Sequence, residues 1–93
     1  MKLIAVEATF GSDAVQSAVD AIEAQAESVR DMSGCEGYAH YRSDDTIAIV
    51  QKWQSMAAFD AYRQSEVFAG LGAALMPLMA GPPVTTVASV DSP

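Results

Sequence analysis

Side chains that bind metals or form disulfides are scarce in this sequence, which contains one cysteine, Cys35, and one histidine, His40. A zinc site of the usual Cys/His type cannot be built from one such chain. A lone cysteine also cannot form a disulfide within its own chain, which is typical of proteins from a reducing compartment. We therefore expect a cytoplasmic protein without a metal site.

Basic residues are few as well: five Lys and Arg stand against twelve Asp and Glu, for a net charge of −7. Nucleic-acid binding depends on Lys and Arg that neutralise phosphates, and anionic membrane surfaces attract the same residues. No stretch approaches the about 18 apolar residues of a membrane span. The first ten residues alternate as a strand does and do not resemble a secretory signal. We expect neither nucleic acid nor membrane as a partner.

Several common catalytic motifs are also missing. The sequence has no glycine-rich loop of the Rossmann or P-loop type and no serine in a G-x-S-x-G elbow. Cys35 has no evident catalytic partner apart from His40. These absences argue against the usual nucleotide-binding sites and against hydrolases with a serine or cysteine nucleophile.

What is present is an alternation of strand and helix patterns in a chain of 93 residues, the size of a single domain over residues 1–93. The order is strand, helix, strand, strand, helix, strand, which predicts a ferredoxin-like α+β fold with a four-stranded antiparallel sheet. We expect strands over residues 2–10, 35–42, 46–54 and 84–90, and helices over residues 13–33, 56–64 and 66–79.

Capping residues set the predicted ends of the helices. Ser12-Asp13 is expected to cap the first helix, which should end near Ser33-Gly34. Ser55 and Ser65 are expected to cap the next two helices, and Pro77 should kink the last one or end it early. The expected apolar stripe of the first helix consists of Val15, Val19, Ile22, Ala26 and Val29.

The first and third strands are apolar on both of their alternating faces, as in Ile47, Ile49 and Trp53 against Ala48 and Val50. A sheet that helices cover on one side only should alternate apolar and polar residues more cleanly. Its second face therefore needs a cover that one chain cannot supply. We expect a homodimer that packs sheet against sheet.

Aromatic residues gather in the middle of the chain. If the hairpin has a two-residue turn at residues 44–45, Tyr38 lies opposite Gln51, and His40 and Trp53 share their sheet face. A three-residue turn would shift the register by one residue and separate this cluster. The hairpin turn thus decides whether these side chains can form one site.

Two segments resemble a known family. Residues 30–38, Arg-Asp-Met-Ser-Gly-Cys-Glu-Gly-Tyr, are similar to the R-x-x-x-G-C-x-x-Y signature of the antibiotic-biosynthesis monooxygenase family. Residues 52–68 resemble its E-x-W-x-s-x-x-A-L/F-x-x-H-x-x-s-x-H-F stretch through Lys52-Trp53-Gln54-Ser55, Ala58-Phe59, Ser65 and Phe68, and Gly81-Pro82-Pro83 is also similar. The resemblance implies a dimeric α+β barrel with a pocket between sheet and helices in each subunit.

The resemblance also implies site residues. Trp53 matches the family tryptophan that lines such pockets, and Tyr38 matches its tyrosine, whereas Gln51 stands where the family usually has glutamate. Members include cofactor-independent oxygenases of quinols and polyketide-type aromatics, and haem-degrading enzymes.

Other family positions are not matched. Tyr62 and Val67 stand where the family often has two histidines, and Gly72 stands at the position of the haem ligand in the haem-degrading branch. Ile49 and Gly70 fall near the basic and amide residues of the polyketide-oxidising branch. These departures leave Trp53 as the firmest correspondence.

Three functions follow. The first is a cofactor-independent monooxygenase of an electron-rich aromatic, a quinol or polyketide-type phenol, in which His40 or Tyr62 takes the substrate proton. The second is a non-catalytic dimeric domain that binds a small aromatic ligand or serves as a scaffold, in which the same aromatic residues are simply core. The third is a haem-degrading monooxygenase. The expected substrate-binding residues are Tyr38, Gln51, Trp53, Phe59 and Phe68.

Overall fold

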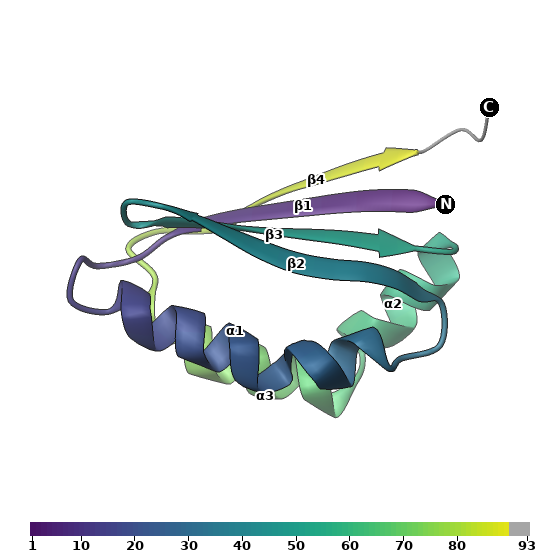
Figure 1. Ribbon diagram of the computed structural model, residues 1–93, viewed down its shortest axis with the longest axis horizontal. Coiled ribbons are helices and arrows are strands. Elements are labelled where there is room, and N and C mark those ends of the chain that lie inside the picture. The colour runs from purple at the N-terminus through teal and green to yellow at the C-terminus, as the bar shows by residue number, and fades with distance from the viewer. Residues whose placement is uncertain (90–93) are drawn as a thin grey trace.

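A computed structural model describes residues 1–89 and shows the predicted ferredoxin-like α+β fold (Figure 1). Its elements follow in the order β1 (Lys2–Thr9), α1 (Val15–Arg30), β2 (Cys35–Ser43), β3 (Thr46–Trp53), α2 (Met56–Arg63), α3 (Glu66–Leu75), a 3-10 turn η1 (Met76–Leu78) and β4 (Val84–Ser89). Val90, the predicted end of the last strand, lies outside the described residues.

The four strands form one antiparallel sheet in the order β2-β3-β1-β4, and the helices lie together on one of its faces (Figure 1). The two central strands, β1 and β3, are those whose sequences are apolar on both sides. Strand β4 forms one edge of the sheet and β2 the other.

The hairpin between β2 and β3 has the two-residue turn that the aromatic cluster requires. Ser43 pairs with Thr46, and Tyr38 pairs with Gln51, as predicted. Asp44 adopts a φ of 53°, in the left-handed region that aspartate tolerates in tight turns. The alternation of side chains then places Tyr38 and Gln51 on the face covered by the helices.

The expected side-chain cap of α1 is wrong. Ala14 occupies the N-cap position, and no side chain caps the helix. The carbonyl of Gly11 instead accepts hydrogen bonds from the backbone N–H groups of Ala14 at 2.8 Å and Val15 at 3.1 Å. A preceding backbone turn thus satisfies the first donors, so neither Ser12 nor Asp13 is needed there.

The other end of α1 also differs, because the helix stops at Arg30 before the expected glycine. Gly34 nevertheless has a φ of +86° in the turn that leads into β2. A Cβ at Gly34 would lie 2.5 Å from the Cβ of Ala58, so α2 approaches this turn too closely for any side chain. Gly34 therefore helps to seat α2 beside the end of β3.

Serine caps begin the two later helices as predicted. The Ser55 hydroxyl accepts a hydrogen bond from the backbone N–H of Ala58, and the Ser65 hydroxyl accepts one from that of Phe68. Helix α3 ends at Leu75, and a 3-10 turn that contains Pro77 follows, which confirms the expected early end.

The core lies between α1 and the sheet. The buried residues of α1 are Val15, Ala18, Ile22, Ala26 and Val29. Ala18 takes the place predicted for Val19, which is only partly buried. On the sheet, Ile4, Ile47 and Trp53 are almost completely buried against the helices.

The opposite face of the sheet has no cover within the described chain. Tyr41 on β2 is 62% exposed, and Leu3, Ala5, Ala48 and Val50 are only partly buried. These residues alternate with the buried set of the same strands, so they lie on the side away from the helices (Figure 1).

Candidate functional site

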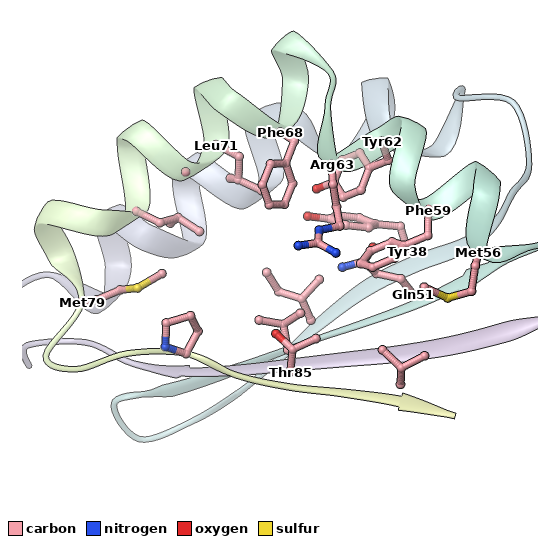
Figure 2. Close-up of a pocket in the computed structure, with 16 residues that line it drawn as sticks. Tyr38, Gln51, Met56, Phe59, Tyr62, Arg63, Phe68, Leu71, Met79 and Thr85 are labelled. Carbon is pink, nitrogen blue, oxygen red and sulfur yellow. The ribbon is translucent and has the colours of Figure 1, made fainter. Parts of the chain in front are cut away.

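A cavity of about 400 Å³ opens between the sheet and helices α2 and α3. Val6 of β1 and Val87 of β4 line it from the sheet, and Phe68 and Leu71 line it from α3. This volume is within the range of pockets for small organic ligands, roughly 300–1,000 Å³. Figure 2 shows the lining side chains pointing into the space from sheet and helices.

Four aromatic rings pack against one another at one end of the cavity. Trp53 and Tyr62 lie nearly parallel, with ring centroids 5.1 Å apart, and Phe68 meets Tyr62 edge-on at 5.2 Å. Phe59 completes the group at 6.3 Å from both Trp53 and Tyr62. These geometries are the favourable ones for aromatic pairs, so the rings of Phe59, Tyr62 and Phe68, which line the cavity, form a well-packed wall.

Trp53 does not itself line the cavity but lies behind the wall, with no exposed surface. Its indole N–H donates a 2.9 Å hydrogen bond to the side-chain oxygen of Gln51. Gln51 lines the cavity and is 4% exposed. Trp53 therefore acts on the cavity through Gln51, whose side chain it holds in place.

Tyr38 carries a buried hydroxyl with no hydrogen-bond partner in the described part of the chain. The residue is 4% exposed and lines the cavity. Burial raises the pKa of Tyr38, and the neighbouring Tyr62 hydroxyl, which interacts with it without the geometry of an ordinary hydrogen bond, opposes that rise. Unpartnered buried polar groups are costly and uncommon in folded proteins, so this hydroxyl is available for a ligand.

Tyr62 adds a second hydroxyl close to that of Tyr38. Burial raises the pKa of Tyr62 strongly, and the adjacent Tyr38 raises it further. The phenol is therefore neutral across the physiological pH range. It is suited to donating a hydrogen bond, and a role as a proton acceptor in its ionised form is disfavoured.

Arg63 brings a positive charge to the same cavity. Its guanidinium lies 5.6 Å from the centre of the Phe59 ring, and Figure 2 shows it directed from α2 into the space. A long contact of 3.9 Å joins it to Asp60, with both side chains more than half exposed. Such an exposed ion pair contributes little, so Arg63 remains free to meet a ligand.

His40 lies outside the cavity lining. Its side chain is 22% exposed, and its Nε2 atom is 3.7 Å from a carboxylate oxygen of Glu23 on α1. The structure thus brings together five of the predicted site residues, namely Tyr38, Gln51, Phe59, Tyr62 and Phe68, and separates His40 and Trp53 from the cavity surface.

Sequence inspection missed Arg63. Two signals in the sequence point to it, since Arg63 is the only basic residue after Lys52 and follows Phe59 by four positions. Residues four apart share one face of a helix, so the position of Phe59 predicts that of Arg63. Met56, Leu71 and Leu75 also line the cavity as ordinary apolar residues.

No cluster of three or more His, Cys, Asp or Glu side chains that could hold a metal ion occurs among residues 1–89. Within the same residues, every helix is too short or too polar to cross a membrane.

Comparison with known proteins assigns the chain to a family. The sequence profile described as antibiotic biosynthesis monooxygenase matches residues 1–72. The chain belongs to the antibiotic biosynthesis monooxygenase family. A search among curated proteins gave no match.

Solved structures of similar shape include a candidate antibiotic biosynthesis monooxygenase from Nitrosomonas europaea, with a TM-score of 0.93, 13% identity and coverage of 97% of this chain and 98% of that one. Another from Caulobacter crescentus has a TM-score of 0.93 and 21% identity over 98% of this chain and 90% of that one. A protein of Mycobacterium tuberculosis has a TM-score of 0.90 and 22% identity over 98% and 96%. These similarities establish the shared fold.

Proposed function

We propose that the protein is a cofactor-independent monooxygenase that binds an electron-rich aromatic, a quinol or a polyketide-type phenol, in the cavity between sheet and helices. The unpartnered Tyr38 hydroxyl in an otherwise largely apolar cavity carries this proposal. An aromatic body would lie against Phe59, Phe68 and Leu71. A phenolic oxygen would accept the hydrogen bond that Tyr38 does not make with any of the described residues.

In such a reaction the substrate supplies the electrons. A phenol with a free para position loses its O–H and C–H hydrogens, one oxygen atom of O2 becomes the new carbonyl oxygen, and the other leaves as water. The cavity would exclude bulk water and hold the ionised substrate. Tyr62 is proposed to donate a hydrogen bond to the substrate oxygen, because its raised pKa keeps it protonated.

The side chains that line the cavity among the described residues include no evident acceptor for the substrate proton. The titratable groups that line the cavity are Tyr38, Tyr62 and Arg63, and none of them is a base at neutral pH. His40 would have to act from outside the lining, beside Glu23. A substrate that is already ionised when it binds would need no base from the protein.

Oxygen uptake with a panel of quinols and phenols tests the proposal. We expect turnover to fall at least about tenfold in each of two variants. Tyr62→Phe removes the hydroxyl proposed to meet the substrate oxygen, and Trp53→Phe releases the Gln51 side chain that lines the cavity. Tyr41→Phe on the exposed outer face is the matched control and should retain full activity. His40→Gln asks separately whether this histidine takes part. Absence of turnover across the panel would contradict the enzyme function.

A non-catalytic small-ligand-binding domain is the second candidate, and the lack of a base among the described residues of the cavity lining favours it. Crystals soaked in air with planar phenols separate the two functions. A phenol that binds in the cavity and stays unoxidised supports the binding domain.

Haem degradation finds little support, because the histidine and the cysteine of the sequence, His40 and Cys35, both lie outside the cavity lining. Gly72, at the family's haem-ligand position, lines the cavity without a side chain to offer. We expect no Soret shift when haemin is added to the protein.

The homodimer is proposed on the uncovered face of the sheet, where apolar residues such as Ala48 and Val50 are only partly buried. Light scattering should give twice the chain mass of 9.8 kDa. Val50→Asp should shift the protein toward monomers, because it places a charge in the middle of that face. A wild-type monomer at working concentration would contradict this assembly.

A cytoplasmic location remains part of the proposal.

A further inference from the structure

We infer that the cavity selects an anion, namely a planar apolar molecule that carries one negatively charged oxygen group, and that it discriminates against the neutral form of the same molecule. A phenolate, an enolate and a carboxylate share this chemistry. The preference rests on the proposed function in one respect, the binding of an aromatic body, and adds the charge that the ligand must carry.

Gln51 is the first group that points to an anion. Its side-chain oxygen already accepts the hydrogen bond of the Trp53 indole at 2.9 Å. An indole N–H can only donate, so the amide cannot be turned around without breaking that bond. The Gln51 amide nitrogen therefore faces the cavity, as Figure 2 shows. Trp53 thus converts a glutamine, which can both donate and accept, into a donor.

The two tyrosines act in the same sense. Tyr38 offers a hydroxyl with no partner in the described chain, and Tyr62 offers another beside it. Both phenols are kept protonated by burial, so each holds a hydrogen that a ligand oxygen can accept.

Arg63 supplies the charge. Its guanidinium carries donors only and enters the cavity from α2. Asp60, its nearest carboxylate at 3.9 Å, is not part of the lining, and no acidic side chain among the described residues is. Thr85 is the one lining hydroxyl apart from the tyrosines, and it can donate as well as accept. An anion would therefore meet donors without facing a lining carboxylate.

The cavity also disfavours neutral ligands, because it offers more hydrogen-bond donors than acceptors. A neutral ligand hydroxyl would have to give its own hydrogen to an acceptor, and among the lining side chains only the hydroxyl oxygens of Tyr38, Tyr62 and Thr85 can accept one, whereas Gln51 and Arg63 present donors. An oxyanion needs no acceptor and can use several donors at once. Because the remaining lining is apolar, with residues such as Val6, Leu71 and Leu75, the ligand should carry its charge at one end only.

Calorimetric titration at neutral pH with matched pairs of probes tests this preference. The first pair is 2-naphthoate and 2-naphthamide, which have the same shape but differ in charge. The second pair is 2,4-dinitrophenolate and 2,4-dinitroanisole, which separates a phenolate source of the charge from a carboxylate source. We expect at least one anion to bind roughly 10- to 100-fold more tightly than its neutral partner, the range for hydrogen bonds to a charged group.

Gln51→Glu is the decisive variant. The glutamate keeps the size of the side chain and an oxygen for the Trp53 hydrogen bond, but it replaces the donor that faces the cavity with a negatively charged acceptor. Affinity for the anion should fall roughly 10- to 100-fold, while that for the neutral probe changes less than about threefold. Arg63→Gln should lower anion affinity about tenfold. Arg42→Gln removes the same charge from β2, outside the cavity lining, and should leave both affinities unchanged.

The outcomes separate the two proposals. Equal affinities within both pairs, or an anion affinity that Gln51→Glu and Arg63→Gln leave intact, would overturn the anion preference while the aromatic site stands. Binding of no probe at all would overturn both. Thermal unfolding of each variant establishes that it is folded before its affinity is compared.

Discussion

The helix-covered face of the sheet has two unlike halves. In the packed half, α1 lies on the sheet through Val15, Ile22 and Val29, which are nearly or fully buried, and no residue of α1 lines the cavity. In the hollow half, side chains of α2 and α3 and of all four strands enclose the cavity. The only buried polar residue identified in the described chain, Gln51, belongs to the hollow half.

The packed half stabilises the fold, whereas the hollow half is available to a ligand. Apolar residues of the packed half meet one another, so each contributes transfer energy and close contacts to folding. Residues of the hollow half face the cavity on one side, where the Gln51 oxygen is held by Trp53 and the Tyr38 hydroxyl has no hydrogen-bond partner in the described chain. The alternating pattern of the strands thus supplies core residues in the packed half and ligand-accessible residues in the hollow half.

The largest expected effect compares one residue from each half. Ile22→Ala should lower the free energy of unfolding by about 4 kcal/mol, because Ile22 is fully buried in the packed half. Leu75→Ala should lower it by only about 2 kcal/mol, since Leu75 lines a cavity that already exists. Urea unfolding of the two variants measures both values. Equal losses would show that the hollow half is packed as tightly as the other.

Trp53→Phe tests the boundary between the halves. We expect a loss of about 2–3 kcal/mol in the free energy of unfolding, because the variant is smaller and leaves the Gln51 oxygen without its donor. Adding Gln51→Leu to Trp53→Phe removes the unpaired group and should recover about 1 kcal/mol. A double variant no more stable than the single one would indicate that only the lost volume matters.

Alkaline pH should affect the hollow half selectively. Burial raises the pKa of Tyr38 and Tyr62 above the ordinary value of 10.0, so both stay protonated in the folded state after they have ionised in the unfolded state. The stability that these two protonated tyrosines contribute is therefore fully present below about pH 10. It is lost as the pH rises further, by up to about 1.4 kcal/mol per pH unit for each tyrosine. Chemical unfolding at several alkaline pH values measures the slope. Tyr62→Phe should reduce it and Tyr41→Phe should not.

The smallest expected effect concerns the Tyr38 hydroxyl. Tyr38→Phe removes a buried group without a partner, so we expect the free energy of unfolding to stay the same or rise by up to about 1 kcal/mol. Affinity for an anionic probe should fall in the same variant, since one donor is lost. A clear loss of stability would mean that the hydroxyl is hydrogen-bonded in solution.

The sequence predicted the fold well because its signals are local or strictly periodic. Ser55 and Ser65 cap their helices, Pro77 ends α3, and the turn at Asp44 sets the hairpin register. The start of α1 was mispredicted because a backbone carbonyl, of Gly11, can replace a capping side chain, and sequence does not distinguish the two.

The site was predicted less completely, because a cavity depends on what packing leaves empty. Strand alternation correctly placed Tyr38 beside Gln51, but it could not tell that Trp53 is covered by Tyr62 or that His40 lies beside α1. Those outcomes depend on how far the helices extend over each strand. Arg63 was overlooked because an arginine on a short helix usually faces water.

Trp53 is the only tryptophan in the sequence. It is fully buried, stacked on Tyr62 and hydrogen-bonded to Gln51. Its fluorescence therefore reports on one buried position directly behind the cavity. Emission should be blue-shifted in the native protein, and a ligand that contacts Gln51 or Tyr62 should alter its intensity without any attached label. The intrinsic fluorescence of Trp53 can therefore be used to screen compounds for binding.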